Sequence, residues 1–378
     1  MKNNKLCMIP GPTPVVRSIQ DQMGRETVSF KDQGFVNDFL SVVADMKTLW
    51  GAEEAYVIAG SGTLAMEMSI ANTLQDGDNC LVITHGYFGD RFIDMLRKRK
   101  INVDVMSSEW GSTVPVEDIA HKLRQKSYQA VTVTHVDTST GVKAEIEEIG
   151  AIVNDLEDTI FIVDGVCSTA AQKEHLQDMH IDILLSGSQK AFGVAPGLAL
   201  LWTSKKAEER RTKLGMIRDS YIDFKLWKPI MDNPMKYFGT PPVNLIWALK
   251  ESLRIIKEEG IQERYQRHQK DAVAIRAALK AIGFNILAEA GSEADTLSNV
   301  MYPEGVDDAA FRAKLAEEGV VVAGGLGAYA GKLFRLGHMG NIDKHIIVST
   351  LQAIERALSH FQEVEMGKAV QTYINKIQ

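Results

Sequence analysis

The sequence predicts an α/β protein whose main domain is a doubly wound, largely parallel β-sheet. Six short runs rich in aliphatic and β-branched residues recur between positions 55 and 202. Their hydrophobicity is continuous rather than alternating, which is typical of strands covered on both faces. Several of the spacers between the runs have the periodicity of amphipathic helices. Alternation of strands and helices favours a parallel sheet with helices on both sides.

The predicted elements follow one another at regular intervals along this part of the chain. The strands are expected at Ala55–Ala59, Cys80–Thr84, Ala130–Thr134, Ile160–Val163, Ile183–Ser186 and Leu198–Trp202. Helices are expected at Thr63–Leu74, Val116–Lys126 and Ile146–Leu156. Together they predict one large α/β domain.

The pattern changes after Trp202. A highly charged helix is expected at Lys205–Leu214, followed by an aromatic, irregular stretch at Tyr221–Thr240. Two long helices, Val243–Gly260 and Ile261–Ile282, lead to short strands and helices that alternate again from Gly283 onward. We therefore expect a large domain at residues 21–260. A smaller C-terminal α/β domain is expected at residues 261–378, with residues 1–20, which are rich in proline and glycine, packed on it.

Composition excludes several classes of function. Hydrophobic residues make up 45% of the 378 residues, which is enough to build a core, so disorder is not expected. The net charge of −7 argues against a nucleic-acid partner, because binding to a phosphate backbone needs a basic face. No apolar run is long enough to span a bilayer, and the N-terminus lacks the apolar core of a signal peptide.

The cysteine and histidine content indicates neither disulfides nor a metal. Cys7, Cys80 and Cys167 form no disulfide framework and no CxxC motif, so a reducing, cytoplasmic location is expected. Nine scattered histidines form no compact cluster with cysteine or aspartate. No metal site is therefore expected.

Two charged residues stand where a buried strand ends. Lys190 closes the sequence Ser186–Lys190 (SGSQK) and is surrounded by small residues, so burial would favour its neutral, nucleophilic amine. Such an amine can form a Schiff base with a carbonyl. Asp164 follows the run Ile160–Val163, and the carboxyl ends of parallel strands line the ligand crevice of an α/β sheet. An aspartate there can pair with a cationic ring nitrogen.

Gly60–Thr63 (GSGT) joins a predicted strand to a predicted helix. Glycines allow close approach of the backbone to an anion, and the N–H groups at a helix N-terminus can bind it. The stretch Gly60-x-Gly62-x-x-Ala65 also matches a dinucleotide-binding fingerprint, which would point to an NAD-dependent oxidoreductase. That motif requires an acidic residue at the end of the next strand, where this chain has Thr84-His85-Gly86. We therefore favour a cup for a single phosphate.

A phosphate cup, a strand-end acid and a buried lysine, in that order, are the parts of a pyridoxal phosphate site. The sequence resembles the class V, fold-type I pyridoxal phosphate aminotransferases over nearly its whole length, and within them the alanine–glyoxylate and serine–pyruvate aminotransferases. The matching segments are Ile9–Pro14 (IPGPTP), Gly60–Thr63, Gly86–Gly89 (GYFG) with Arg91, Thr138–Gly141 (TSTG), Asp164–Ser168 (DGVCS), Ser186–Lys190, Tyr237–Thr240 (YFGT), Gly324–Gly327 (GGLG) and Phe334–Gly337 (FRLG).

The resemblance implies a fold and a role for each matching residue. The fold would be a large domain with a seven-stranded, mostly parallel sheet, plus the smaller C-terminal domain. Lys190 would form the Schiff base with the cofactor and Asp164 would pair with its ring nitrogen. The other cofactor-binding positions implied are Ser61, Gly62, Thr63 and Gln189 at the phosphate, Phe88 and Val166 on the two ring faces, Thr138 beside cofactor and substrate, and Tyr237 and Thr240 reaching the phosphate of the neighbouring subunit.

The resemblance also implies the reaction and the assembly. Arg335, in the Phe334–Gly337 motif, would bind the substrate carboxylate, because a planar guanidinium makes two parallel hydrogen bonds to it. One such arginine favours small substrates with a single carboxylate. The expected activity is ping-pong transamination from alanine or serine to glyoxylate or pyruvate, in a homodimer with shared active sites.

Three alternatives stay open at this point. A 2-aminoethylphosphonate–pyruvate aminotransferase would share the fold and the cofactor. A desulfurase or another lyase of this fold would carry a nucleophilic cysteine on a loop and a histidine before the lysine, whereas Gln189 precedes Lys190 here. A non-enzymatic binding protein would have no reason to keep Lys190, Asp164 and Arg335 together.

Overall fold

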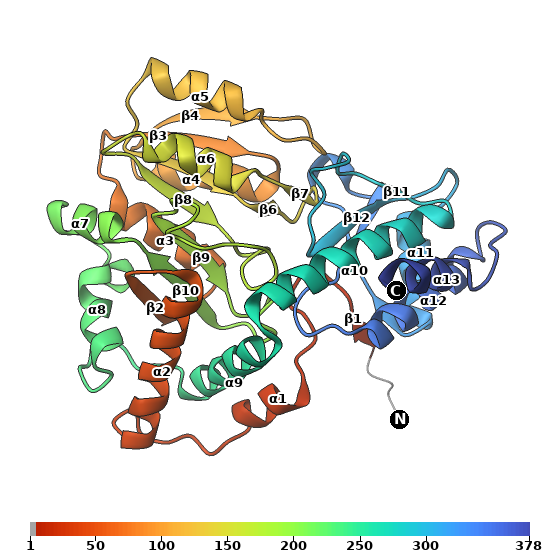
Figure 1. The fold of residues 1–378 in the computed structure, drawn as a ribbon, viewed down its shortest axis with the longest axis horizontal. Helices are drawn as coiled ribbons and strands as arrows, with labels where there is room; N and C mark the ends of the chain where they lie inside the picture. The colour runs from red at the N-terminus through yellow and green to blue at the C-terminus, as the bar shows by residue number, and fades with distance from the viewer. Residues whose placement is uncertain (1–4) are drawn as a thin grey trace.

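The computed structural model describes residues 5–378, and its two largest sheets lie side by side (Figure 1). The larger sheet has seven strands in the order β2-β10-β9-β8-β5-β3-β4. Six of them run parallel, and β10 runs antiparallel to both of its neighbours, β2 and β9. The expected seven-stranded, mostly parallel sheet is therefore confirmed. Its strands are β2 (Glu54–Ala59), β3 (Asn79–Thr84), β4 (Asn102–Ser107), β5 (Ala130–Thr134), β8 (Ile160–Asp164), β9 (Ile183–Gly187) and β10 (Leu198–Thr203).

The strand that the sequence pattern missed is β4. It lies at the edge of the sheet and pairs only with β3. None of its residues is fully buried, and its sequence, NVDVMS, mixes polar and apolar residues. An edge strand lacks the continuous apolar run that marks strands covered on both faces, so β4 carries no such signal.

Helices cover both faces of this sheet. They are α1 (Arg17–Met23), α2 (Gln33–Trp50), α3 (Gly62–Thr73), α4 (Tyr87–Lys98), α5 (Val116–Gln125), α6 (Ile146–Asn154), α7 (Lys205–Lys213), α8 (Phe224–Asp232) and α9 (Val243–Glu259), with a 3-10 turn at Ser220–Ile222. A short hairpin, β6 (Val136–Asp137) and β7 (Val142–Lys143), follows β5.

The expectation of an irregular stretch at Tyr221–Thr240 is wrong for its first half, which contains α8. The Asp223 side chain caps this helix by accepting a hydrogen bond from the backbone N–H of Lys225. Phe224, Trp227 and Ile230 recur at helical spacing and are buried. Burial of this apolar face outweighs the disruption caused by Pro229 inside the helix.

The smaller unit is built on a four-stranded antiparallel sheet in the order β11-β12-β15-β14. Its strands are β11 (Asn285–Ile286), β12 (Leu297–Met301), β14 (Ala323–Gly324) and β15 (Leu333–Gly337), and β13 (Val320–Val321) pairs separately with β1 (Leu6–Cys7). The helices of this unit are α10 (Ile261–Ala281), α11 (Asp308–Glu317), α12 (Lys344–Leu358) and α13 (Lys368–Ile377), with a 3-10 turn at Gly327–Tyr329.

The N-terminal segment is divided between the two units. β1 and the buried Met8 join the smaller unit, as expected. Helix α1 does not, because Ile19 is buried in the hydrophobic core of the large sheet and α1 packs along α9. Two separate hydrophobic cores are compatible with a division near residue 260, but the exact domain boundaries stay a prediction.

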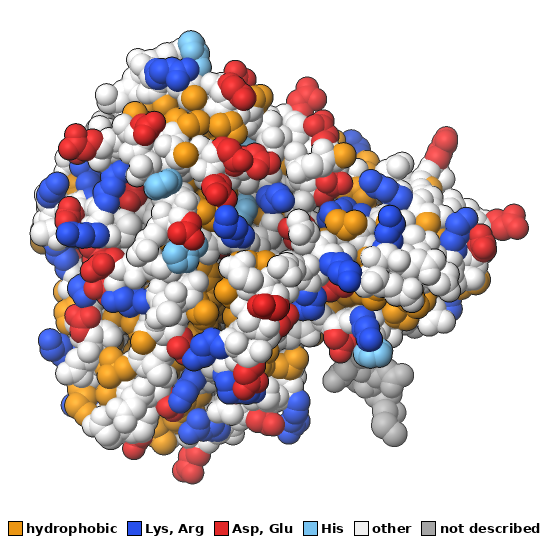
Figure 2. Space-filling model, in the orientation of Figure 1, with side chains coloured by type: hydrophobic (Ala, Val, Ile, Leu, Met, Phe, Trp, Pro, Cys, Tyr) orange, Lys and Arg blue, Asp and Glu red, His pale blue; other side chains and the backbone are white. Residues whose placement is uncertain are grey.

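The surface shows no segregation of charge by sign on the face seen in Figure 2, where acidic and basic side chains are interspersed. Within residues 5–378, no helix combines the length and the apolar character needed to cross a bilayer.

Candidate active site

A cavity opens at the carboxyl edge of the large sheet, and we call it the Lys190 cavity. The turns after β2, β3, β5, β8 and β9 all reach this edge, because these strands share one direction. Its lining includes nine of the predicted site residues: Ser61, Gly62, Thr63, Phe88, Thr138, Asp164, Val166, Gln189 and Lys190. Met66, Arg91, Thr134, Val136 and Cys167 complete the lining.

Lys190 is buried immediately after β9, beneath the N-terminal loop. Its Nζ donates a hydrogen bond to the carbonyl of Pro10, and the Thr13 hydroxyl donates to the backbone carbonyl of Lys190 over 2.8 Å. Gly11 has a φ of +94°, and a Cβ there would lie 2.3 Å from Cδ of Lys190. Only glycine therefore allows the loop to lie flat on the lysine side chain.

These contacts with the N-terminal loop were not predicted from the sequence. Pro10 and Gly11 lie about 180 positions before Lys190 in the chain, and no local pattern connects residues so far apart. The Ile9–Pro14 motif was the available signal, since the resemblance begins there.

Asp164 ends β8 and is 3% exposed. Its Oδ1 accepts a hydrogen bond from the backbone N–H of Val166 over 2.9 Å. Burial raises the pKa of this carboxyl to about 7; the charge of Asp137 also raises it, and Lys190 lowers it. Asp164 has no ion-pair partner within the described part of the chain, so its carboxylate is an unpaired acceptor facing the cavity.

The N-terminus of α3 forms another wall of the cavity. Ser61 is the N-cap residue, and the first backbone hydrogen bond of the helix runs from Ala65 to its carbonyl, which leaves the preceding N–H groups toward the cavity. A Cβ on Gly62 would lie 2.7 Å from Val166, so glycine is needed for α3 to approach the turn after Asp164. Gln189 lies beside this helix end, and its buried Oε1 has no partner within residues 5–378.

Phe88 is held in place by the buried carboxylate of Asp137. Oδ2 of Asp137 accepts the backbone N–H groups of Phe88 (2.9 Å) and Gly89 (3.1 Å), at the start of α4. Oδ1 accepts both the backbone N–H and the hydroxyl of Ser139. Burial raises the pKa of Asp137, while these hydrogen bonds oppose the shift. Asp137 was not predicted as a site residue, because the helix that it caps starts 50 residues away in the chain.

Arg91 joins the aromatic wall to the α3 wall. Its guanidinium carbon lies 5.0 Å from the centre of the Phe88 ring, and Nη1 donates to the Thr63 hydroxyl over 3.3 Å. Arg91 belongs to one of the matching motifs, but no role was predicted for it. Its position adds a positive charge beside the predicted phosphate cup.

Thr138 and Cys167 face each other across the cavity wall. The Thr138 hydroxyl lies 3.0 Å from the Cys167 sulfur. Cys167 is 2% exposed and packs among the core residues, as a small packing residue would.

Three predicted site residues do not line the Lys190 cavity. Arg335 lies in β15 of the smaller unit and donates from Nε to the carbonyl of Gly324 over 2.8 Å. Burial lowers the pKa of this guanidinium, and the negative charge of Asp137 opposes the shift. Tyr237 and Thr240 lie in the loop between α8 and α9, and Tyr237 is 65% exposed. Their hydroxyls are 3.4 Å apart.

Comparison with known proteins decides the family. The family model described as aminotransferase class-V matches residues 35–339. The chain belongs to the class-V aminotransferases. An uncharacterized aminotransferase of Methanocaldococcus jannaschii is 36% identical to it over 371 residues, covering 97% of this chain and 96% of the relative. Alanine–glyoxylate aminotransferase 1 of Saccharomyces cerevisiae is 34% identical over 357 residues, with coverage of 88% and 91%.

Comparison with solved structures indicates the same family. The crystal structure of an alanine–glyoxylate aminotransferase from Nostoc sp. superimposes with a TM-score of 0.90 and 31% identity, over 94% of this chain and 95% of that one. The resemblance drawn from the motifs is confirmed, and the enzyme is a pyridoxal phosphate-dependent aminotransferase. The family match decides against the nicotinamide-dependent reading of the Gly60–Ala65 fingerprint.

The Lys190 cavity of this aminotransferase fits pyridoxal phosphate. Asp164 supplies an unpaired buried carboxylate, which is the acceptor that a protonated ring nitrogen needs. Lys190 supplies an amine for the aldehyde, and the open end of α3 supplies backbone donors for a phosphate. Phe88 and Val166 supply apolar walls. Within residues 5–378 there is no group of three or more His, Cys, Asp or Glu residues arranged to hold a metal ion.

Proposed function

We propose that this aminotransferase moves the amino group of alanine or serine to glyoxylate or pyruvate by a ping-pong mechanism. The observation that carries the proposal is the convergence of Lys190, Asp164 and the N-terminus of α3 on one cavity. The yeast relative and the Nostoc structure are both named alanine–glyoxylate aminotransferases, which supports the choice of donor and acceptor.

The two charged residues have complementary roles. Pyridoxal phosphate, when bound, supplies a ring that withdraws electrons from the substrate Cα. Asp164 is proposed to hold the proton on the ring nitrogen, and the burial of its carboxylate makes that interaction strong. Lys190 is proposed to hold the cofactor at rest and to take the proton from the substrate Cα as general base. The loop at Pro10 and Gly11 covers one side of this lysine.

The remaining cavity residues are proposed to hold and orient the cofactor. Ser61, Gly62 and Thr63 offer hydrogen-bond donors to the phosphate, with Gln189 beside them. Phe88 is proposed to stack on one face of the ring. Val166 and Thr138 are proposed to contact the opposite face and the substrate side, respectively.

Arg335 is proposed to bind the substrate carboxylate. Its Nε is engaged by the Gly324 carbonyl, which leaves the two terminal nitrogens for a bidentate interaction. Arg91, the arginine that lines the cavity, lies beside the predicted phosphate cup, so Arg335 is the one arginine proposed for a substrate carboxylate. A small side chain such as that of alanine or serine therefore suits the site best.

We propose a homodimer in which each site is completed by the partner subunit. Tyr237 and Thr240 present hydroxyls to solvent, away from the cavity of their own subunit. The same loop also exposes Met235, and the preceding helix α8 exposes Leu226. A second copy on this surface would bury these side chains and would bring both hydroxyls to the neighbouring phosphate.

We also propose a cytoplasmic location. The support is that all three cysteines, Cys7, Cys80 and Cys167, are free thiols in the structure.

A matrix of amino donors and oxo-acid acceptors tests the proposed reaction. We expect the highest kcat/KM with alanine or serine as donor and glyoxylate or pyruvate as acceptor. Aspartate, glutamate and 2-aminoethylphosphonate are expected to be at least tenfold poorer. Preference for 2-aminoethylphosphonate with pyruvate would replace the proposal by the phosphonate alternative. Turnover without an oxo-acid acceptor would indicate a lyase.

Mixing two inactive variants tests the shared site. One carries Lys190→Ala and the other carries both Tyr237→Phe and Thr240→Val. In a hybrid dimer, one of the two sites regains Lys190 together with both partner hydroxyls, so activity should partly return. If subunit exchange is demonstrated and activity stays at the sum of the parents, the cross-subunit role is wrong.

A further inference from the structure

A buried arginine lies behind the Lys190 cavity, at the start of α10. The side chain of Arg264 is 0% exposed, and Glu259 is its ion-pair partner, with Nη1 2.6 Å from Oε2. Burial of a guanidinium is costly unless its donors are satisfied, and here they are. Nε donates to the carbonyl of Ala170 over 2.8 Å, and Nη2 donates to the carbonyl of Ala191 over 2.8 Å.

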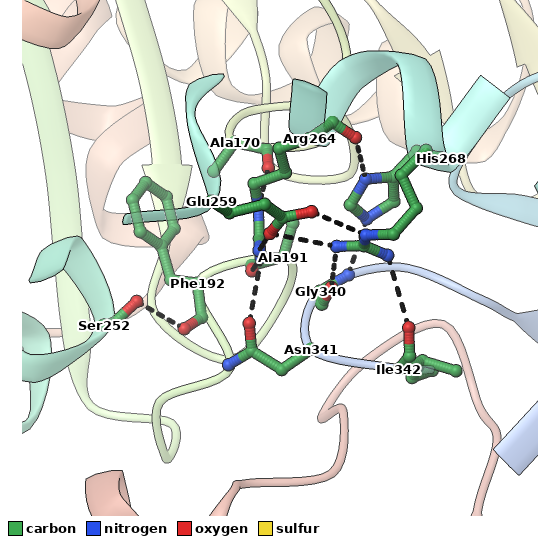
Figure 3. A network of polar contacts seen from close by, with 11 residues as sticks. Ala170, Ala191, Phe192, Ser252, Glu259, Arg264, His268, Gly340, Asn341 and Ile342 are labelled. Atoms are coloured by element: carbon green, nitrogen blue, oxygen red, sulfur yellow. Dashed lines mark hydrogen bonds and ion pairs between the residues drawn. The ribbon is translucent and has the colours of Figure 1, made fainter. Parts of the chain in front are cut away.

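These two carbonyls belong to the turns that carry the cofactor-binding residues. Ala191 immediately follows Lys190. Ala170 lies in the turn that follows Asp164. Nη2 also reaches Oδ1 of Asn341 over 3.2 Å, in the loop after the strand that carries Arg335. Figure 3 shows the guanidinium between these three loops, which come from β8, β9 and β15.

The contact with Ala170 holds a backbone conformation that is unfavourable by itself. Ala170 has a φ of +69°, in the left-handed region that a non-glycine residue rarely occupies. Such a conformation persists only where surrounding contacts hold it. The hydrogen bond from Arg264 is one of these contacts, so loss of the guanidinium should release the turn that ends at Ala170.

A neighbouring arginine provides an internal comparison. Arg267 also pairs with Glu259, and it donates to the carbonyls of Gly340 (2.9 Å) and Ile342 (3.2 Å). His268 accepts the backbone N–H of Gly340. Arg267 thus holds only the loop of the smaller unit, whereas Arg264 also holds the two turns of the large sheet.

We propose that Arg264 is a positioning residue that fixes the position of Lys190 relative to Asp164. Its rigid fork ties the backbone directly after Lys190 to the turn after Asp164, and it anchors both to the loop after β15. Arg264 is not among the residues that line the Lys190 cavity. This inference rests on the proposed roles of Lys190 and Asp164, and it adds a residue that controls their relative position.

Arg264→Lys is the test variant and Arg267→Lys is its matched control. Lysine keeps the charge opposite Glu259 but cannot donate to two carbonyls in the plane of a fork. Amide hydrogen exchange reports on the turns directly in the cofactor-free protein. Gly193 N–H donates to the carbonyl of Lys190, and Thr169 N–H donates to the carbonyl of Gly165. We expect both amides to exchange at least tenfold faster in Arg264→Lys and at the wild-type rate in Arg267→Lys.

Steady-state kinetics of the loaded enzyme provide the second measurement. Arg264→Lys should lower kcat at least tenfold and leave the KM for the amino donor within twofold, because substrate contacts are unchanged. Equal effects of the two variants on exchange and on kcat would overturn the proposal. The exchange result does not depend on the substrate, so failure of the proposed reaction and failure of this inference are distinguishable.

Native-state exchange of the wild type covers the case in which Arg264→Lys does not fold. With rising denaturant, Gly193, Thr169 and Gly340 should lose protection in one opening event, since a single side chain links their loops. Separate openings of the three amides would show that Arg264 does not hold these loops together.

Discussion

Asp164→Asn should stabilise the cofactor-free protein at alkaline pH and should lower the activity of the enzyme that has cofactor bound. The pKa of this buried carboxyl is raised from 3.8 to about 7, so the folded state disfavours the charged form. Between these two values the unfolded chain binds fewer protons than the folded protein, and stability falls as the pH rises. Asparagine has the same shape and carries no charge at any of these pH values.

The magnitude follows from the size of the shift. Each pKa unit corresponds to about 1.4 kcal/mol, so the free-energy cost of the buried charge grows by on the order of 3 kcal/mol between pH 5 and pH 8.5. The unfolding free energy of Asp164→Asn should therefore rise by about this amount relative to the wild type over that interval. Activity should change in the opposite direction. Loss of a charge-assisted interaction worth ~1.5–3 kcal/mol lowers kcat about tenfold or more.

Urea unfolding of the cofactor-free proteins at pH 5 and pH 8.5 measures the difference. Asp104→Asn is the control, because the pKa of Asp104 is lowered, chiefly by a hydrogen bond from Tyr128. That group is ionised at both pH values in the folded and the unfolded state, so the difference between this variant and the wild type should not change with pH. If the advantage of Asp164→Asn also stays constant from pH 5 to pH 8.5, the carboxylate is not the buried, unpaired group described above.

Three further substitutions address the lysine, the loop that covers it and the substrate arginine. Lys190→Ala should abolish turnover and the visible absorbance of the lysine-linked cofactor with the fold intact by circular dichroism; substantial transamination without an added amine would contradict its role. Gly11→Ala places a Cβ 2.3 Å from Lys190 at a φ of +94°, so the lysine must move. We expect a loss of about 1–3 kcal/mol in unfolding free energy and at least a tenfold lower kcat, and wild-type values for both would refute the packing argument. Arg335→Lys removes the fork for the carboxylate, so the KM for alanine should rise about tenfold or more, whereas an unchanged KM would exclude Arg335 from substrate binding.

Local sequence patterns determined most of the large sheet and the central part of the site. Continuous apolar runs located six of the seven strands of this sheet, because strands covered on both faces need such runs. Lys190, Asp164 and Gly62 were found because each stands at the end of a strand or the start of a helix. In a sheet whose strands share one direction, these ends meet at one edge, so their convergence follows from the topology.

Only the tertiary structure decided the contacts that hold these residues in place. Pro10 lies 180 positions from Lys190, Asp137 about 50 from Phe88, and Arg264 73 from Ala191. Asp137 and Arg264 are polar and Pro10 precedes a glycine. The sequence around each of them indicates only a loop or the surface of a helix. Which carbonyl a guanidinium reaches, or which helix a carboxylate caps, depends on how complete elements pack. Periodicity along the chain carries no information about that packing, because it records only which face of each element is buried.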